Sequence, residues 1–286
     1  LLASVLAQLP RRFGRMGAEL GREMALRMPV MQFLDLREAL PGLEIGDGSP
    51  CIWEARRVKS AAEIERIRFV CQLASEAYEN LTNLISTGEN LRDVCRKLTI
   101  DLLQRGADAV PFLPAIAGSD GVKQIVCGPQ DKDLEAGDIM FIDTGTTYDG
   151  YFCDFDRNWA VGDVSDAANR ANAAVWDATE AGIAAARPGV TVEDVWRAQS
   201  VVLEAAGSLG NNVGRMGHGL GMALTEPPSN MPGDNTMLEP GVVLTIEPGM
   251  EFADGRMIVH EENIVITEDG CELLTKRAPR EMWRID

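Results

Sequence analysis

The chain is poor in basic residues relative to acidic ones. Its 286 residues include 27 Lys and Arg against 44 Asp and Glu, which gives a formal net charge of −17. Binding to nucleic acid through phosphate contacts depends on clustered Lys and Arg, so no nucleic-acid partner is expected. The sequence also lacks an uninterrupted apolar run near the ~18 residues that span a bilayer, so no membrane partner is expected either.

Closely spaced cysteines are also missing. The six Cys residues include no CxxC pair, and a chain of this length does not need disulfides to be stable. Reduced thiols in a cytoplasmic protein are therefore expected. The 45% hydrophobic and 25% charged residues are typical of a folded protein, and the length suggests one large domain, or one domain with part of another.

A change of pattern near residue 57 predicts two parts. Residues 1–57 mix short apolar pieces with four prolines and the GDGSP stretch at 46–50, which is typical of the tail of a preceding domain and a linker. From Ser60 onward the pattern is that of a regular domain. This domain is predicted to comprise residues 58–286. Ser60 followed by Glu63 forms a capping box, and apolar residues then recur at helical spacing up to Gly88.

The order of predicted elements repeats. Helices are expected near 60–88 and 90–104 and again near 165–186 and 191–206, and β runs are expected at 138–144, 151–155, 242–247 and 257–267. Two helices followed by a hairpin, twice over, predict an α+β fold with duplicated halves around a mostly antiparallel, curved sheet.

Both predicted hairpins bring carboxylates together. A turn centred between Tyr148 and Asp149 places Asp143 opposite Asp154, with Cβ atoms about 5 Å apart. A turn centred on Asp254 places Glu247 opposite Glu261, although a bulge at the turn glycine would shift this second register by one residue. Opposed like charges destabilise a sheet, so each pair needs a shared proton or a cation. The alternative is chance opposition on a solvated face.

His218 is the remaining candidate ligand. A lone histidine is more often a packed core residue, but three glycines at 217, 219 and 221 would let the backbone pass close to another group. Four carboxylates and one imidazole would balance two divalent cations. Oxygen-rich ligation with one nitrogen suits Mn²⁺, Co²⁺ or Zn²⁺.

These residues resemble a known family, the pita-bread metallohydrolases, which include prolidase, aminopeptidase P and methionine aminopeptidase, with creatinase as a relative. The resemblance covers about residues 57–286 and is greatest to the prolidase branch. It implies that residues 1–57 are the remnant of an N-terminal creatinase/prolidase-type domain. The motifs that carry it are found, in order, at 142–145, 151–154, 217–221, 246–249 and 261–267.

The resemblance implies a metal centre and roles for its residues. Asp154 and Glu261 would bridge the two metals, Asp143 would bind one metal, and His218 and Glu247 would bind the other. Glu247 would also carry a proton to the leaving nitrogen.

One family feature is missing. Thr225 stands where the family's peptidases usually carry a second histidine, and the usual histidine ahead of the first Asp is absent too. Thr225 can donate one hydrogen bond but carries no charge. His260 is a poor replacement because strand alternation turns it away from the face of Glu261.

The function expected from this resemblance is a dinuclear metal-dependent hydrolase of a C–N amide bond, such as a Xaa-Pro peptidase or prolidase-like aminopeptidase acting on small peptides. One alternative is a hydrolase or lyase of a small nitrogenous substrate on the same scaffold, which the missing histidines favour. Another is a non-catalytic binding module, although four buried carboxylates without metal would cost stability. A homodimer is implied by the resemblance.

Two further acids lie beside the predicted ligands. Glu262 should point to the opposite face from Glu261 and is expected to be solvated or paired with an arginine. Asp156 has the same strand parity as Asp154, but a salt bridge to Arg157 or Arg215 is the expected role.

Overall fold

The computed structural model describes residues 1–10, 14–210 and 214–286, and the chain divides into two compact units, Leu1–Arg56 and Arg57–Asp286. In the smaller unit, two short strands pair in parallel. Its elements are α1 (Leu2–Gln8), β1 (Arg15–Ala18), α2 (Val30–Ala39), β2 (Glu44–Asp47) and α3 (Ser49–Arg57), which ends at the boundary. None of the helices in the described ranges is long and apolar enough to cross a membrane.

The first half of the larger unit begins with the predicted helix pair. The capping box of Ser60 and Glu63 is confirmed at the start of α4, but the helix ends at Leu81 rather than near Gly88. Asn90 caps α5, and Gly106 ends it in the left-handed conformation. The elements are α4 (Ala61–Leu81), α5 (Leu91–Arg105), β3 (Ala109–Phe112), β4 (Ala115–Ser119), β5 (Asp138–Tyr148), β6 (Tyr151–Phe152) and β7 (Phe155–Val161).

The second half repeats this order with helices α6 (Asp166–Ala185) and α7 (Val192–Ala205). Its strands are β8 (His218–Gly219), β9 (Glu226–Ser229), β10 (Val243–Ile246), β11 (Gly249–Ala253), β12 (Arg256–Val259), β13 (Glu262–Ile266), β14 (Cys271–Leu273) and β15 (Trp283–Ile285). The last strand, β15, returns to the first half and pairs in parallel with β7.

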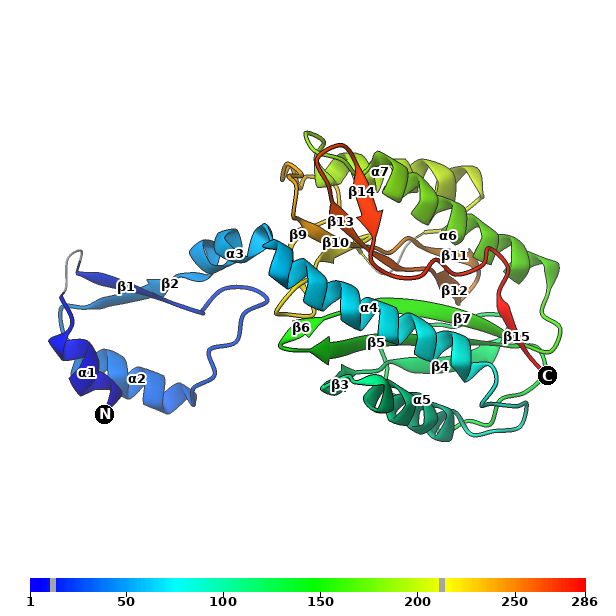
Figure 1. Ribbon diagram of the computed structural model, residues 1–286, viewed down its shortest axis with the longest axis horizontal. Helices are drawn as coiled ribbons and strands as arrows, with labels where there is room; N and C mark the ends of the chain where they lie inside the picture. Colours follow the sequence, from blue (N-terminus) through cyan, green and yellow to red (C-terminus); the bar gives the residue numbers. More distant parts are fainter. Residues whose placement is uncertain (11–13, 211–213) are drawn as a thin grey trace. The chain divides into compact units, whose positions relative to one another are not determined.

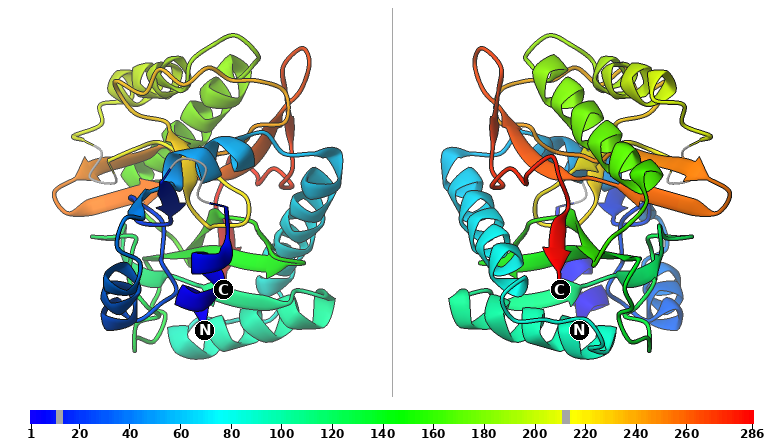
Figure 2. Two further views of the ribbon diagram at one scale, coloured as in Figure 1. Left: turned by 90° about the vertical axis from the view of Figure 1, so that its left-hand side faces the viewer. Right: turned by 90° about the vertical axis from the view of Figure 1, so that its right-hand side faces the viewer.

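The strands lie between the two helix pairs. In the larger unit, β5 is the centre of one sheet and β10 with β13 the centre of another, and apart from β15 the described pairings are antiparallel. Helix α4 crosses the sheet of the first half, and α6 packs against β11 and β12 in the second (Figure 1). Figure 2 shows the strands of this unit flanked by helices on their outer sides. The expected α+β class and the duplicated order are confirmed.

The register of the first hairpin differs from the prediction by two residues. Asp149 and Gly150 both have positive φ, so they form the two-residue loop and Tyr148 pairs with Tyr151. Consequently Asp143 lies opposite Asp156, and not opposite Asp154. The turn is thus centred one residue later than expected, and each such step changes the pairing by two.

The second hairpin has the predicted register near its base. Gly249 pairs with Val259 and Ile246 with Glu262, so Glu247 and Glu261 fall between two segments that share the predicted register. The expected irregularity is present as well, between Glu251 and Ala253, but it lies beyond the segment that sets this register.

Candidate metal centre

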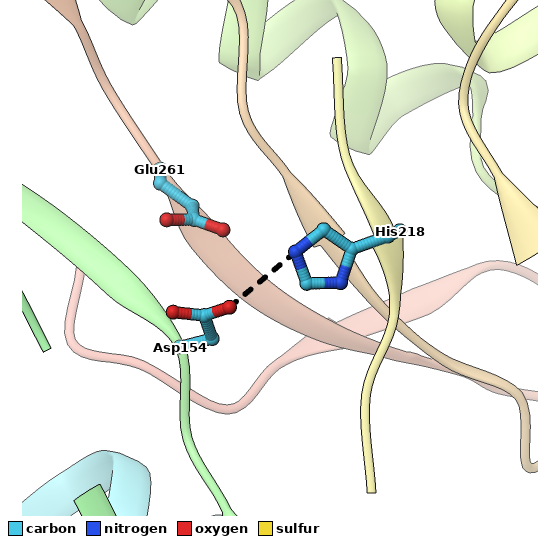
Figure 3. A group of neighbouring side chains, drawn as sticks. All are labelled: Asp154, His218 and Glu261. Carbon is cyan, nitrogen blue, oxygen red and sulfur yellow. Dashed lines mark ion pairs between the residues drawn. The ribbon is translucent and has the colours of Figure 1, made fainter. Parts of the chain in front are cut away.

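Three of the five predicted ligands meet in the larger unit. Asp154 lies between β6 and β7, His218 is in β8, and Glu261 lies between β12 and β13. One potential ligand atom from each of them lies within 4.8 Å of those of the other two, and all three side chains are buried. Figure 3 shows the three side chains pointing toward one another from separate segments of the chain.

The orientation of the His218 ring suits a metal ligand. Its Nδ1 lies 2.8 Å from the carbonyl oxygen of Gly219, and because a carbonyl can only accept, Nδ1 carries the proton. In the neutral ring the lone pair is then on Nε2, which lies 3.3 Å from Oδ2 of Asp154. A lone pair facing a carboxylate is repulsive unless a proton or a cation lies between them. A backbone carbonyl that fixes the tautomer in this way is a common feature of metal-binding histidines.

The glycines around His218 are explained by close backbone contacts. Gly217 has φ +128°, and a Cβ there would lie 2.1 Å from the carbonyl oxygen of Thr245. A Cβ on Gly219 would lie 2.4 Å from the carbonyl oxygen of Pro227. The glycine-rich loop therefore lets β8 fit between β10 and β9.

Several buried carboxylate oxygens have no hydrogen-bond partner among the described residues. They are Oδ1 of Asp143, Oδ1 of Asp154, both oxygens of Asp156 and Oε1 of Glu261. An unpaired buried carboxylate costs several kcal/mol, and native proteins keep few such groups. Two of these residues, Asp154 and Glu261, belong to the group of three that could hold a metal ion.

Asp143 and Glu247, the other two predicted ligands, lie outside the group of three. Both are half-buried. Burial, Asp154 and Glu247 raise the pKa of Asp143 well above its usual value. Burial raises the pKa of Glu247 to about 7, with Asp154 acting in the same direction and His218 and Arg215 opposing it. The two groups are thus electrostatically part of the site.

Residues of neighbouring strands hold the backbones of the three predicted ligands in place. The amide side chain of Asn263, on β13, accepts a hydrogen bond from the backbone N–H of Asp154 at 3.0 Å and donates one to its carbonyl oxygen. The Thr245 hydroxyl accepts from the backbone N–H of His218 at 3.1 Å. Arg157 donates to the backbone carbonyl of Glu261 at 2.7 Å. These contacts preorganise the three converging groups.

Glu262 is paired with arginine, as expected, but it is fully buried and not solvated. Its carboxylate binds Arg157 and Arg277, each at 3.0 Å, and His260 at 3.2 Å. Burial alone would raise the pKa of Glu262, but the positive charge of Arg157 and its other partners lower it below the usual range. His260 is thus bound to Glu262, which agrees with the expectation that it faces away from Glu261.

The prediction that Asp156 forms a salt bridge with Arg157 or Arg215 is wrong. Arg157 donates to the backbone carbonyl of Asp156 and directs its guanidinium to Glu262. The Asp156 carboxylate is 1% exposed and has no hydrogen-bond partner among the residues that the structure describes. The actual partners of Arg157 and Arg215 could not be predicted from the sequence, because they depend on contacts between segments far apart in the chain.

Thr225 lies beside a cation and not in the group of three. Its hydroxyl accepts a hydrogen bond from Nη2 of Arg215 at 3.3 Å, and the Ser229 hydroxyl accepts one from Nη1 at 3.3 Å. Arg215 acts electrostatically on the ligands: burial raises the pKa of Asp154, and the Arg215 charge opposes that rise. Arg215 was expected only as a possible partner for Asp156, and its contact with Thr225 was not predicted.

Comparison with known proteins identifies the family. Residues 65–268 match metallopeptidase family M24. The chain is 31% identical over 257 residues to the probable dipeptidase PepE of Mycobacterium tuberculosis, covering 89% of this chain and 68% of that protein. The chain belongs to metallopeptidase family M24.

Two further relatives carry names related to proline. The chain is 29% identical over 225 residues to the Xaa-Pro dipeptidase of Pyrococcus furiosus, covering 79% of this chain and 65% of that protein. The structure of the X-Pro aminopeptidase from Thermotoga maritima superposes with a TM-score of 0.80 at 26% identity, covering 91% of this chain and 73% of that one. The chain thus spans about two thirds of the length of its curated relatives. These matches confirm the expected pita-bread fold and the metallopeptidase class.

Proposed function

We propose that this protein is a dinuclear metal-dependent hydrolase of amide bonds, and that its substrates are small Xaa-Pro peptides. The observation that carries the proposal is the convergence of Asp154, His218 and Glu261, with the His218 lone pair and unpartnered carboxylate oxygens facing one another. The names of the PepE and Xaa-Pro dipeptidase relatives support the substrate class.

The donor set fits two divalent cations. Asp154 and Glu261 would hold both ions, Asp143 one of them, and His218 and Glu247 the other; Mn²⁺, Co²⁺ and Zn²⁺ all suit such ligands. When bound, two ions lower the pKa of a water molecule toward neutral and polarise a carbonyl oxygen. The positive charge of the two ions would be balanced at the unpartnered carboxylate oxygens of Asp143, Asp154 and Glu261.

Glu247 and Arg215 have further roles in the proposal. Glu247 is half-buried beside the group of three, and the family resemblance gives its carboxylate the task of carrying a proton to the leaving nitrogen. Arg215 is a fixed positive charge that Thr225 and Ser229 orient. It supplies positive charge in place of the two missing histidines, and this charge would stabilise a developing oxyanion or a substrate carboxylate.

Metal analysis and substrate assays test the proposal. The purified chain should contain about two divalent ions and should hydrolyse dipeptides that end in proline. Bound ions with turnover confined to small nitrogenous osmolytes would favour the alternative substrate class, for which Thr225 in place of histidine is the supporting observation. An ion-free protein that turns over neither would support a binding module. A homodimer and a cytoplasmic location stay predictions from the resemblance and the composition.

A further inference from the structure

The structure places an additional acid beside the proposed ligands. In the pairing of β5 with β7, Asp156 lies directly opposite Asp143. Directly opposed residues of an antiparallel pair point to the same face, with Cβ atoms about 4.5–5.5 Å apart. Asp156 therefore belongs to the same acidic site and not to a separate surface.

The surroundings of Asp156 leave its charge unbalanced. Its side chain is 1% exposed, and neither carboxylate oxygen has a hydrogen-bond partner in the described part of the chain. The guanidinium of the neighbouring Arg157 binds the Glu262 carboxylate and three backbone carbonyls, those of Asp156, Glu261 and Lys276. A carboxylate buried in this way is costly unless a cation binds it.

We propose that Asp156 is a further ligand of the metal centre and shares with Asp143 the ion on that side of the site. This inference rests on the proposed dinuclear centre. Five carboxylates carry −5, which two divalent ions and the nearby Arg215 balance with +5. The added carboxylate makes the donor set richer in oxygen, and such sets suit Mn²⁺ better than softer ions. Asp156 therefore shifts the preference of the site toward Mn²⁺ relative to Zn²⁺.

Metal titration of Asp156→Asn tests the inference. The full chain is stripped with a chelator, and Mn²⁺ and Zn²⁺ are titrated separately by calorimetry, with elemental analysis for stoichiometry. We expect the Mn²⁺ affinity to fall about 10–100-fold and the Zn²⁺ affinity to fall less, so that the Mn²⁺-to-Zn²⁺ ratio drops about tenfold. Asp163→Asn is the matched control, because the Asp163 side chain is 94% exposed and pairs with Arg284 at the surface; it should leave both affinities unchanged.

Thermal melting separates this role from a structural one. Because Asp156→Asn removes an unbalanced buried charge, the metal-free variant should melt at or above the wild-type temperature, and Mn²⁺ should stabilise it less. A lower melting temperature with both affinities unchanged would overturn the inference and leave the proposed function intact. Wild-type protein that binds no ion would overturn both. If Asp156→Asn does not fold, Asp156→Glu displaces the carboxylate by one methylene and must likewise weaken Mn²⁺ binding, or the inference is wrong.

Discussion

Two adjacent glutamates are both buried and have opposite environments. Glu261 has an oxygen without a partner among the described residues, and burial and surrounding acids raise its pKa well above the usual value. Glu262 is held by two arginines, a histidine and the Thr275 hydroxyl, and the positive charge of Arg157 and the contacts with His260 and Arg277 lower its pKa despite its burial. The fold thus satisfies one carboxylate with its own side chains and leaves an oxygen of its neighbour unpaired among the described residues, which is where we propose that an ion binds.

The contrast distinguishes a structural acid from a functional one. Strand alternation turns Glu261 and Glu262 to opposite faces, and the arginines lie on the face of Glu262. Arg157 contacts both glutamates: its guanidinium binds the Glu262 carboxylate and donates to the Glu261 backbone carbonyl. A structural ion pair therefore positions the proposed ligand next to it.

The largest expected effect is at the centre of the acidic group. Asp154→Asn should lower kcat for a Xaa-Pro dipeptide by at least about 10³-fold, or about 4 kcal/mol, because a neutral amide holds the cations less well. Stopped assays with metal-loaded protein measure the loss, and metal content is measured on the same samples. The Asp177→Asn variant, at a surface pair with Arg280, should keep normal turnover. Full activity of Asp154→Asn would exclude the dinuclear mechanism.

A matched pair of substitutions tests the contrast in stability. In metal-free protein, Glu262→Gln should lower the free energy of unfolding by about 3 kcal/mol, because it leaves the buried Arg157 charge without its partner. Glu261→Gln should leave this free energy unchanged or raise it, because the new amide can donate to the surrounding carboxylates. Urea denaturation in a chelator measures both, and equal losses in the two variants would refute the distinction.

Local rules predicted the parts of the fold that depend on a few neighbouring residues. The capping box at Ser60 and the base of the second hairpin follow from such rules. The first register was missed because the Asp149–Gly150 loop was centred one residue too early. The family's ligand pattern located the acidic site.

The environment of Asp156 and the role of Arg215 could not be predicted, because each depends on contacts between distant strands. Three residues supplied the deciding contacts. Arg157 bonds with β13, Asn263 holds Asp154, and Arg215 reaches Thr225. No periodicity in the sequence specifies these pairings.

The two kinds of acid also predict opposite pH responses. Burial raises the pKa of Glu247 to about 7 in the ion-free fold, so its stabilising contribution is complete below its ordinary pKa of 4.5 and is lost as pH rises through 7. Between pH 6 and 8 this loss is about 1.4 kcal/mol. The Glu262 pKa is lowered, so its contribution is present above 4.5 and is lost as pH falls.

Chelator-treated protein melted at pH 6, 7 and 8 checks this response. The wild-type melting temperature should fall with rising pH, and Glu247→Gln should show a shallower slope. Saturating Mn²⁺ should abolish the fall, because the cation binds the ionised carboxylate. A slope that is the same in the wild type and in Glu247→Gln would show that Glu247 does not titrate in this range.

The smallest expected effect concerns the cation at the edge of the site. Thr225→Val keeps the side-chain shape and removes the hydroxyl that accepts the hydrogen bond from Arg215. Losing one such bond should cost about 1 kcal/mol, so kcat/KM for a Xaa-Pro dipeptide should fall about fivefold while metal content stays at two ions. Thr267→Val is the control, because its hydroxyl bonds only locally with Asp269 at an exposed position. A Thr225→Val enzyme with unchanged kcat/KM would mean that Arg215 does not need this hydroxyl to act on the substrate, whereas a loss of metal would place Thr225 among the groups that hold the ligands.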